Sequence, residues 1–171
     1  MYNFKFISFG VLLTSILSCG KSQTLPIGSK IPEFKLNDQQ GKTFDIKDYV
    51  GKKNLVIYFY PKDETPGCTK EACTFRDQYE AFLKDSAMVI GISAQSVDSH
   101  KEFADHHKLP FTLLSDPDNA VRKLFGVRVG PIPGRVTFVV NKKGSIAYVF
   151  ESQMEAARHV DEALRVLKEL N

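Results

Sequence analysis

Two of the three cysteines, Cys68 and Cys73, lie five positions apart at the end of a stretch that begins at Tyr58. Thr65 and Pro66 precede Cys68, and this order is typical of a helix start, because threonine is a good N-cap and proline is favoured at the first helical position. Cys68 would then lie in the first turn, where the positive end of the helix favours the thiolate. The residues therefore predict a nucleophilic cysteine at the start of a helix.

The spacing of the two cysteines limits how they can react with each other. Residues five apart on a helix differ by about 140° in direction and are about 8 to 9 Å apart at Cα, whereas a disulfide spans no more than about 7 Å. A Cys68–Cys73 disulfide thus requires the first helical turn to unwind. Two alternatives stay open: an inert buried cysteine, and a metal site, which is disfavoured because the two sulfurs diverge.

The four histidines do not suggest a metal centre. His106 and His107 are adjacent, so on a helix they would project about 100° apart and form a poor pair of ligands. For these two residues, and for His100 and His159, the sequence indicates a solvated helix face. The histidine spacing therefore does not predict a metal site.

Apolar runs and amphipathic patterns predict the elements that position the cysteines. Strands are expected at 33–36, 43–46, 54–60, 88–94, 111–114, 136–140 and 145–150, and helices at 68–84, 97–108, 119–125 and 155–170. Strands that alternate with helices imply βαβ crossovers, hence an α/β protein with a largely covered sheet. Cys68 would lie where a strand meets a helix, which is a favoured place for chemistry in such sheets.

Composition restricts the class of protein. The 171 residues are 43% hydrophobic, enough for one domain with a real core. Lys and Arg number 23 against 20 Asp and Glu, and the charges are interspersed, which gives no reason to expect a nucleic-acid partner. Three cysteines are too few for a disulfide scaffold in a chain of this length.

The N-terminal segment resembles a targeting signal. The apolar stretch 6–17 is short for a membrane span, which needs roughly twenty residues. The segment 16–19 resembles a bacterial lipobox, so Cys19 is a candidate for lipidation and for a membrane anchor. The expected organisation is a signal peptide at 1–18, a tether at 19–26 and a domain at 27–171. The expected location is the periplasmic side of a bacterial membrane as an exported lipoprotein, with a soluble periplasmic protein as the alternative.

The pattern Pro61-x-x-x-Thr65-x-x-Cys68 resembles the active-site motif of peroxiredoxins. The surrounding residues 58–77 are similar to the bacterioferritin-comigratory, or Q-type, subfamily, in which a resolving cysteine lies five residues after the peroxidatic one. Residues 109–116 and 134–138 also resemble that subfamily. The resemblance covers residues 27–170.

This resemblance implies a thioredoxin-like fold: a central mixed β-sheet flanked by helices, with an N-terminal β-hairpin. It implies reduction of hydrogen peroxide and organic hydroperoxides, with thioredoxin or a similar dithiol as the reductant and without a metal, haem, flavin or other cofactor. Cys68 would attack the peroxide and Cys73 would resolve the sulfenic acid as a disulfide. Thr65 and Arg135 would bind the peroxide, and Pro61 would shield the pocket. Members of the subfamily are often monomers.

Each of these roles has an alternative that the sequence leaves open. Thr65 could be a plain N-cap, Pro61 a strand terminator and Arg135 a surface salt bridge, with Arg128 as a nearby competitor. The whole protein could instead be an exported thiol-disulfide oxidoreductase, although such proteins usually have a Cys-x-x-Cys motif. It could also be a non-enzymatic binding module with a structural cysteine pair.

Overall fold

The centre of the fold is β3 (Asn54–Phe59), in which every residue is buried. The structure is a computed structural model that describes residues 24–170. Strands β4 (Ala87–Ser93) and β5 (Thr112–Ser115) continue the sheet in parallel on one side of β3. Such nearly continuous apolar strands are expected where both faces of a sheet are covered.

Antiparallel strands complete the sheet at both edges. An N-terminal hairpin of β1 (Lys35–Asp38) and β2 (Thr43–Asp45) pairs through β1 with β5. On the other side, β6 (Val136–Val140) pairs with β3, and β7 (Ile146–Glu151) pairs with β6. The order of the seven strands is β2-β1-β5-β4-β3-β6-β7.

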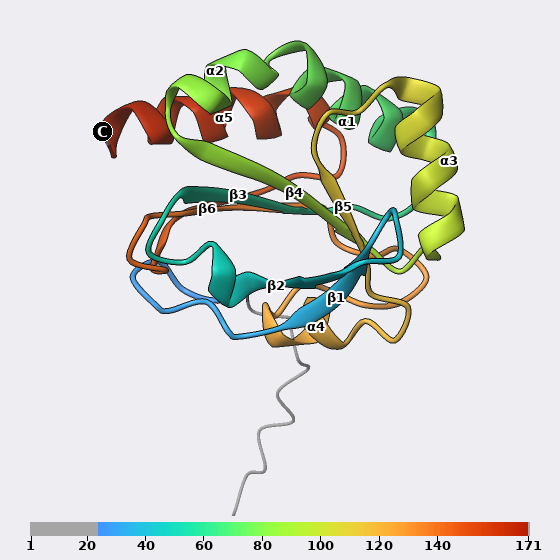
Figure 1. Cartoon of the computed structure of the whole chain (residues 1–171), viewed down its shortest axis with the longest axis horizontal. Helices are drawn as coiled ribbons and strands as arrows, with labels where there is room; N and C mark the ends of the chain where they lie inside the picture. Colours follow the sequence, from blue (N-terminus) through green and yellow to red (C-terminus); the bar gives the residue numbers. More distant parts are fainter. Residues whose placement is uncertain (1–23, 171) are drawn as a thin grey trace, which may run out of the picture.

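The helices form layers on the two faces of the sheet (Figure 1). One face packs against α1 (Pro66–Asp77), α2 (Tyr79–Lys84), α3 (Val97–His107) and α5 (Ala156–Glu169). The other is covered by the short helices η1 (Ile46–Asp48) and α4 (Ala120–Leu124) with neighbouring loops. Each face of the sheet has its own hydrophobic core: the first core lies under α1, α2, α3 and α5, and the second core lies on the opposite face. Side chains alternate along β3, so Val56 and Tyr58 belong to the first core, whereas Leu55, Ile57 and Phe59 belong to the second.

The fold class expected from the sequence is confirmed: a mixed central sheet is flanked by helices and has an N-terminal hairpin. The helix expected over 68–84 is wrong in one respect, because it is two helices with a break at Gln78, where φ is −102° and ψ is 9°. The apolar pattern crosses this break because Phe75 and Phe82 pack in the same core, with ring centroids 5.5 Å apart. Periodicity therefore could not reveal it.

The predicted signal peptide, 1–18, and the candidate lipidation site, Cys19, lie outside the described residues. The end of the predicted tether packs on the domain: the Leu25 N–H donates to the Phe125 carbonyl at 3.1 Å, and Leu25 contacts the second core. Among residues 24–170, no helix combines the length and the apolar character that crossing a membrane requires.

Candidate active site

Cys68 is the third residue of α1, directly after the loop that leaves β3. Thr65 is the N-cap and Pro66 opens the helix, as the sequence predicted. Cys68 is buried, and its thiol faces the first core together with Ala72. Its place in the first turn puts the sulfur near backbone N–H groups that have no partner within the helix.

Arg135 is the residue before β6, and its side chain contacts Cys68 of α1. Its Nη2 donates to Cys68 Sγ at 3.3 Å, and its Nη1 pairs with Glu71 Oε2. Arg135 is 4% exposed, so the prediction of a buried thiolate partner fits the geometry better than a surface salt bridge. Arg128, the competitor, is exposed. Gly67 allows the approach, because a Cβ there would lie 3.1 Å from Arg135 Nη2.

Glu71, the partner of Arg135, has a completely buried side chain. Burial raises the pKa of Glu71 to about 8, although Arg135 acts in the opposite direction. Burial lowers the pKa of Arg135, but Glu71 and Cys68 outweigh that effect and the net shift is upward. Arg135 therefore keeps its charge, whereas burial favours the protonated form of the Glu71 carboxyl. This leaves more of the guanidinium charge available to a negative sulfur.

His159 of α5 is buried next to Glu71. Its Nε2 lies 2.9 Å from the Ser152 carbonyl, which can only accept, so this nitrogen carries the proton. Its Nδ1 then accepts from the Thr137 hydroxyl at 2.8 Å. Burial lowers the pKa of His159 to about 4, so it is neutral and forms no ion pair with Glu71, whose Oε1 is 3.6 Å from Nδ1.

Thr65 and Pro61 lie in the loop between β3 and α1. The Thr65 hydroxyl donates to the Lys62 carbonyl at 3.0 Å and makes no capping bond to the helix, although its backbone is the N-cap. Because its proton is directed at Lys62, its oxygen lone pairs are left to accept a hydrogen bond. Pro61 is half-buried and lies two residues after the end of β3.

Cys73 is also on α1 and is half-buried, and neither it nor Cys68 is in a disulfide. The two thiols therefore lie on one continuous helix, Pro66–Asp77, at the spacing that forbids a direct bond. Cys73 neighbours Arg76, whose pKa is raised chiefly by its hydrogen bond to Asp77, with a smaller contribution from Cys73.

The sequence analysis missed Arg122, a buried residue of α4. Its Nη2 donates to the Tyr60 carbonyl at 2.7 Å and its Nη1 donates to the Gly134 carbonyl at 2.8 Å. These carbonyls belong to the residues immediately before Arg135 and Pro61, so the Arg122 side chain links the segment that carries Arg135 to the loop that carries Pro61. Burial lowers the pKa of Arg122 to about 10, which leaves it a cation at neutral pH. Its partners are two backbone carbonyls, so no pattern of residue types marked it in the sequence.

The solvated faces expected for His100 and His159 are wrong, because both side chains are 0% exposed. His100 Nδ1 lies 2.9 Å from Asp63 Oδ2, and the Tyr60 hydroxyl donates to Asp63 Oδ1 at 2.7 Å. Burial would raise the pKa of Asp63, but these bonds outweigh it and lower the pKa. Asp63 is in the β3–α1 loop, so the buried group anchors the loop that presents Thr65.

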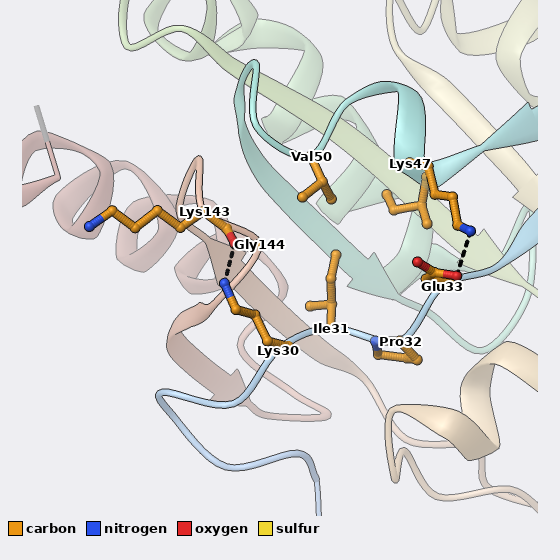
Figure 2. A pocket seen from close by; sticks show the side chains of 9 residues that line it. Lys30, Ile31, Pro32, Glu33, Lys47, Val50, Lys143 and Gly144 are labelled. Atoms are coloured by element: carbon orange, nitrogen blue, oxygen red, sulfur yellow. Dashed lines mark hydrogen bonds and ion pairs between the residues drawn. The ribbon is translucent and has the colours of Figure 1, made fainter.

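A cavity of about 370 Å³ lies at another part of the molecule. It is lined by Lys30, Ile31, Pro32, Glu33, Ile46, Lys47, Val50, Lys143 and Gly144 (Figure 2). Lys47 is paired with Glu33 at 2.6 Å, Lys30 donates to the Lys143 carbonyl at 2.5 Å, and the Lys143 side chain extends away from the cavity. The cavity includes none of the residues around Cys68.

Comparison with known proteins gives consistent relatives. Residues 27–149 match the model of the AhpC/TSA family. The chain is 49% identical over 155 residues to the chloroplastic peroxiredoxin Q of Triticum aestivum, which covers 89% of this chain and 70% of the relative. Among solved structures it resembles peroxidoxin BcpB of Mycobacterium tuberculosis, with a TM-score of 0.81, 33% identity and coverage of 85% and 97% of the two chains.

A second structural relative is the bacterioferritin comigratory protein of Xanthomonas campestris, whose structures concern its alkyl peroxide reduction activity. It has a TM-score of 0.74 and 31% identity, and the match covers 80% of this chain and 90% of that one. The location expected from the N-terminal segment is wrong: the curated relatives are chloroplastic plant proteins rather than periplasmic bacterial lipoproteins. The lipobox resemblance rested on four residues, whereas these matches extend over most of the chain.

Proposed function

The chain belongs to the AhpC/TSA family as a peroxiredoxin of the Q type and is a thiol-dependent peroxidase, and we propose that Cys68 is its peroxidatic residue and Cys73 its resolving residue. The substrate is a peroxide. The observation that supports this assignment best is the 3.3 Å contact between Arg135 Nη2 and Cys68 Sγ, which brings a buried cation to one of the two cysteines.

In the proposed first step, the Cys68 thiolate attacks one peroxide oxygen and the O–O bond breaks. Cys68 becomes a sulfenic acid, and the other oxygen leaves as an alkoxide or hydroxide that takes up a proton. Arg135 stabilises the thiolate and the charge that develops on the leaving oxygen. Thr65 accepts a hydrogen bond from the peroxide O–H, since its own proton is held by the Lys62 carbonyl. Pro61 shields the reacting atoms from water.

In the second step, the first turn of α1 unwinds and the Cys73 sulfur attacks the Cys68 sulfur, which releases water and forms the disulfide. An external dithiol of the thioredoxin type then reduces the disulfide by exchange. Both cysteines belong to one chain, so a monomer can complete the cycle. Organic hydroperoxides join hydrogen peroxide as proposed substrates, because alkyl peroxide reduction is described for the Xanthomonas relative.

Quenched-flow mass spectrometry tests these roles, and it is preferable to tryptophan fluorescence because the chain contains no tryptophan. Peroxide should convert the reduced protein to a Cys68–Cys73 disulfide in two steps. Cys73→Ser should stop at the Cys68 sulfenic acid, and Cys68→Ser should not react at a comparable rate. If Cys68→Ser reacted as fast as the parent protein while Cys73→Ser did not, the two assignments would have to be exchanged.

A further inference from the structure

Glu64, His106 and His107 bring three ligand-type side chains together on the surface. Glu64 precedes the N-cap of α1, whereas the two histidines end α3. His106 Nδ1 is 3.1 Å from Glu64 Oε1, and His107 Nε2 is 3.1 Å from Glu64 Oε2. One ligand atom from each residue lies within 4.8 Å of the others. The sequence analysis did not foresee this grouping, because it depends on a carboxylate from elsewhere in the chain that contacts both rings.

The geometry and the atom types suit a transition metal ion. Imidazole nitrogens and a carboxylate oxygen are ligands that Zn²⁺ accepts, at about 2.0 to 2.2 Å. In a tetrahedral site such bonds separate neighbouring ligand atoms by about 3.3 Å. Each histidine nitrogen lies 3.1 Å from a different oxygen of Glu64, so a small shift of the side chains would bring both nitrogens to one ion. The side chains of His106 and Glu64 are 69% and 49% exposed, so they can make small adjustments and an ion can enter from solvent.

Buried contacts hold both sides of the cluster in place. On one side, Glu64 has a left-handed backbone with φ of 57°, next to Asp63, which is fixed by Tyr60 and His100. On the other, the His107 carbonyl accepts from Arg76 Nη1 at 2.7 Å, and the His107 ring packs edge-on against Phe103. Two of the three ligands are thus preorganised, which lowers the cost of binding.

We propose that Glu64, His106 and His107 bind one divalent transition metal ion of the Zn²⁺ type, with water completing its coordination. The ion would link the β3–α1 loop to the end of α3. None of its three ligands belongs to the group of Arg135, Glu71 and Cys68. The alternative is a hydrogen-bonded cluster that holds no metal.

Binding should be measured on the full chain with Cys19, Cys68 and Cys73 all changed to serine, because thiolates would otherwise compete for the metal. Titration calorimetry with Zn²⁺ should show one ion per chain. Co²⁺ should give the visible absorption of a four-coordinate nitrogen and oxygen site, without a thiolate charge-transfer band. In NMR spectra, Zn²⁺ should shift the ring signals of His106 and His107 and leave those of the buried His100 and His159 in place.

Substitutions identify the ligands. Glu64→Gln, His106→Gln and His107→Gln should each weaken Zn²⁺ binding by at least about tenfold, which is the lower end of the effect seen when even the partners of metal ligands are altered. Asp98→Asn, an exposed change in the first turn of the same helix, should leave the affinity unchanged. Circular dichroism confirms that each variant is folded. Absence of Zn²⁺ and Co²⁺ binding by the serine-substituted chain, or binding that survives all three ligand changes, would overturn the proposal.

Discussion

At the scale of single residues, the contact with the buried Arg135, at 3.3 Å from Nη2 to Sγ, distinguishes Cys68 from Cys73. Its guanidinium donates to Glu71 through Nη1 and to Cys68 through Nη2, because the planar group presents several N–H donors in a fixed arrangement. A lysine has the same charge but only one point of attachment. The geometry of the contact therefore matters in addition to its charge.

Replacing Arg135 tests this directly. Arg135→Ala should slow oxidation of Cys68 by peroxide by about 10²- to 10³-fold, the range found when one transition-state donor is removed. Arg135→Lys should restore part of that rate because it returns a cation. Arg128→Ala, at an exposed arginine nearby, is the matched control and should react normally. A near-normal rate for Arg135→Ala, measured by quenched flow, would reject the role of this arginine.

The protonated state of Glu71 predicts a dependence of stability on pH. The pKa of Glu71 is raised from 4.5 to about 8, so between these values the unfolded chain loses a proton that the folded chain keeps. The contribution of Glu71 to stability is thus fully present below pH 4.5 and is lost as the pH rises through about 8. Glu71→Gln, which cannot ionise, should remove this contribution.

The measurement is the free energy of unfolding in denaturant at a series of pH values, compared between the parent and Glu71→Gln. Taking the difference cancels titrating groups that do not contact Glu71. His159 lies 3.6 Å from Glu71, and its lowered pKa makes stability rise with pH below its ordinary value, which is opposite in sign to the Glu71 effect. Glu80→Gln, at an exposed position on α2, should parallel the parent throughout. A difference between parent and Glu71→Gln that stays constant from pH 5 to pH 8 would show that Glu71 ionises normally.

At the scale of elements, α1 must exist in two states for the proposed cycle. Its first turn holds Cys68 when reduced, and the spacing to Cys73 prevents a disulfide until that turn unwinds. Amide hydrogens of residues 69–74 should therefore be protected in the reduced protein and should exchange much faster in the oxidised one, since Thr69 N–H makes the first backbone bond of the helix, to Thr65. Those of α5 should be protected equally in both states. Identical protection of residues 69–74 in the two states would refute the unwinding.

Local patterns in the sequence were sufficient to predict most of the elements. The strand expected at 136–140 has the observed bounds, and the N-cap at Thr65 was readable from residue types alone. What local patterns could not supply was the partner of each polar side chain. His159 follows Ala156 by three positions and precedes Ala163 by four, so its buried stripe was visible. Its partner Thr137, however, lies on a distant strand.

The same distinction applies to the candidate site. Cys68, Cys73 and Thr65 follow from a local motif, and Arg135 followed from resemblance to a family. Arg122 could not be identified in either way, because its partners are two backbone carbonyls that carry no sequence signal. Convergence of Glu64 with two histidines likewise depends on how a loop and the end of a helix meet in the folded chain.

At the scale of the whole molecule, side chains of the parallel strands β3, β4 and β5 support α1, and one position among them is a glycine. Gly91 of β4 lies between Tyr58 of β3 and Leu113 of β5. A Cβ at position 91 would come within 2.7 Å of both side chains. The Tyr58 ring in turn stacks on Phe75 of α1, with ring centroids 4.7 Å apart. A side chain at the centre of the sheet would therefore disturb the helix that holds Cys68.

Gly91→Ala should lower the free energy of unfolding by about 1 to 3 kcal/mol, the usual cost of overpacking a core, and should slow peroxide reduction by displacing α1. Tyr58→Phe alone should be neutral or stabilising, since the buried Tyr58 hydroxyl has no hydrogen-bond partner among the described residues. In the Gly91→Ala background, Tyr58→Phe should restore more stability than it adds to the parent, because it also removes one of the clashing atoms. Denaturant unfolding of the four proteins measures this coupling; strictly additive effects would mean that the sheet accommodates the methyl group without moving Tyr58.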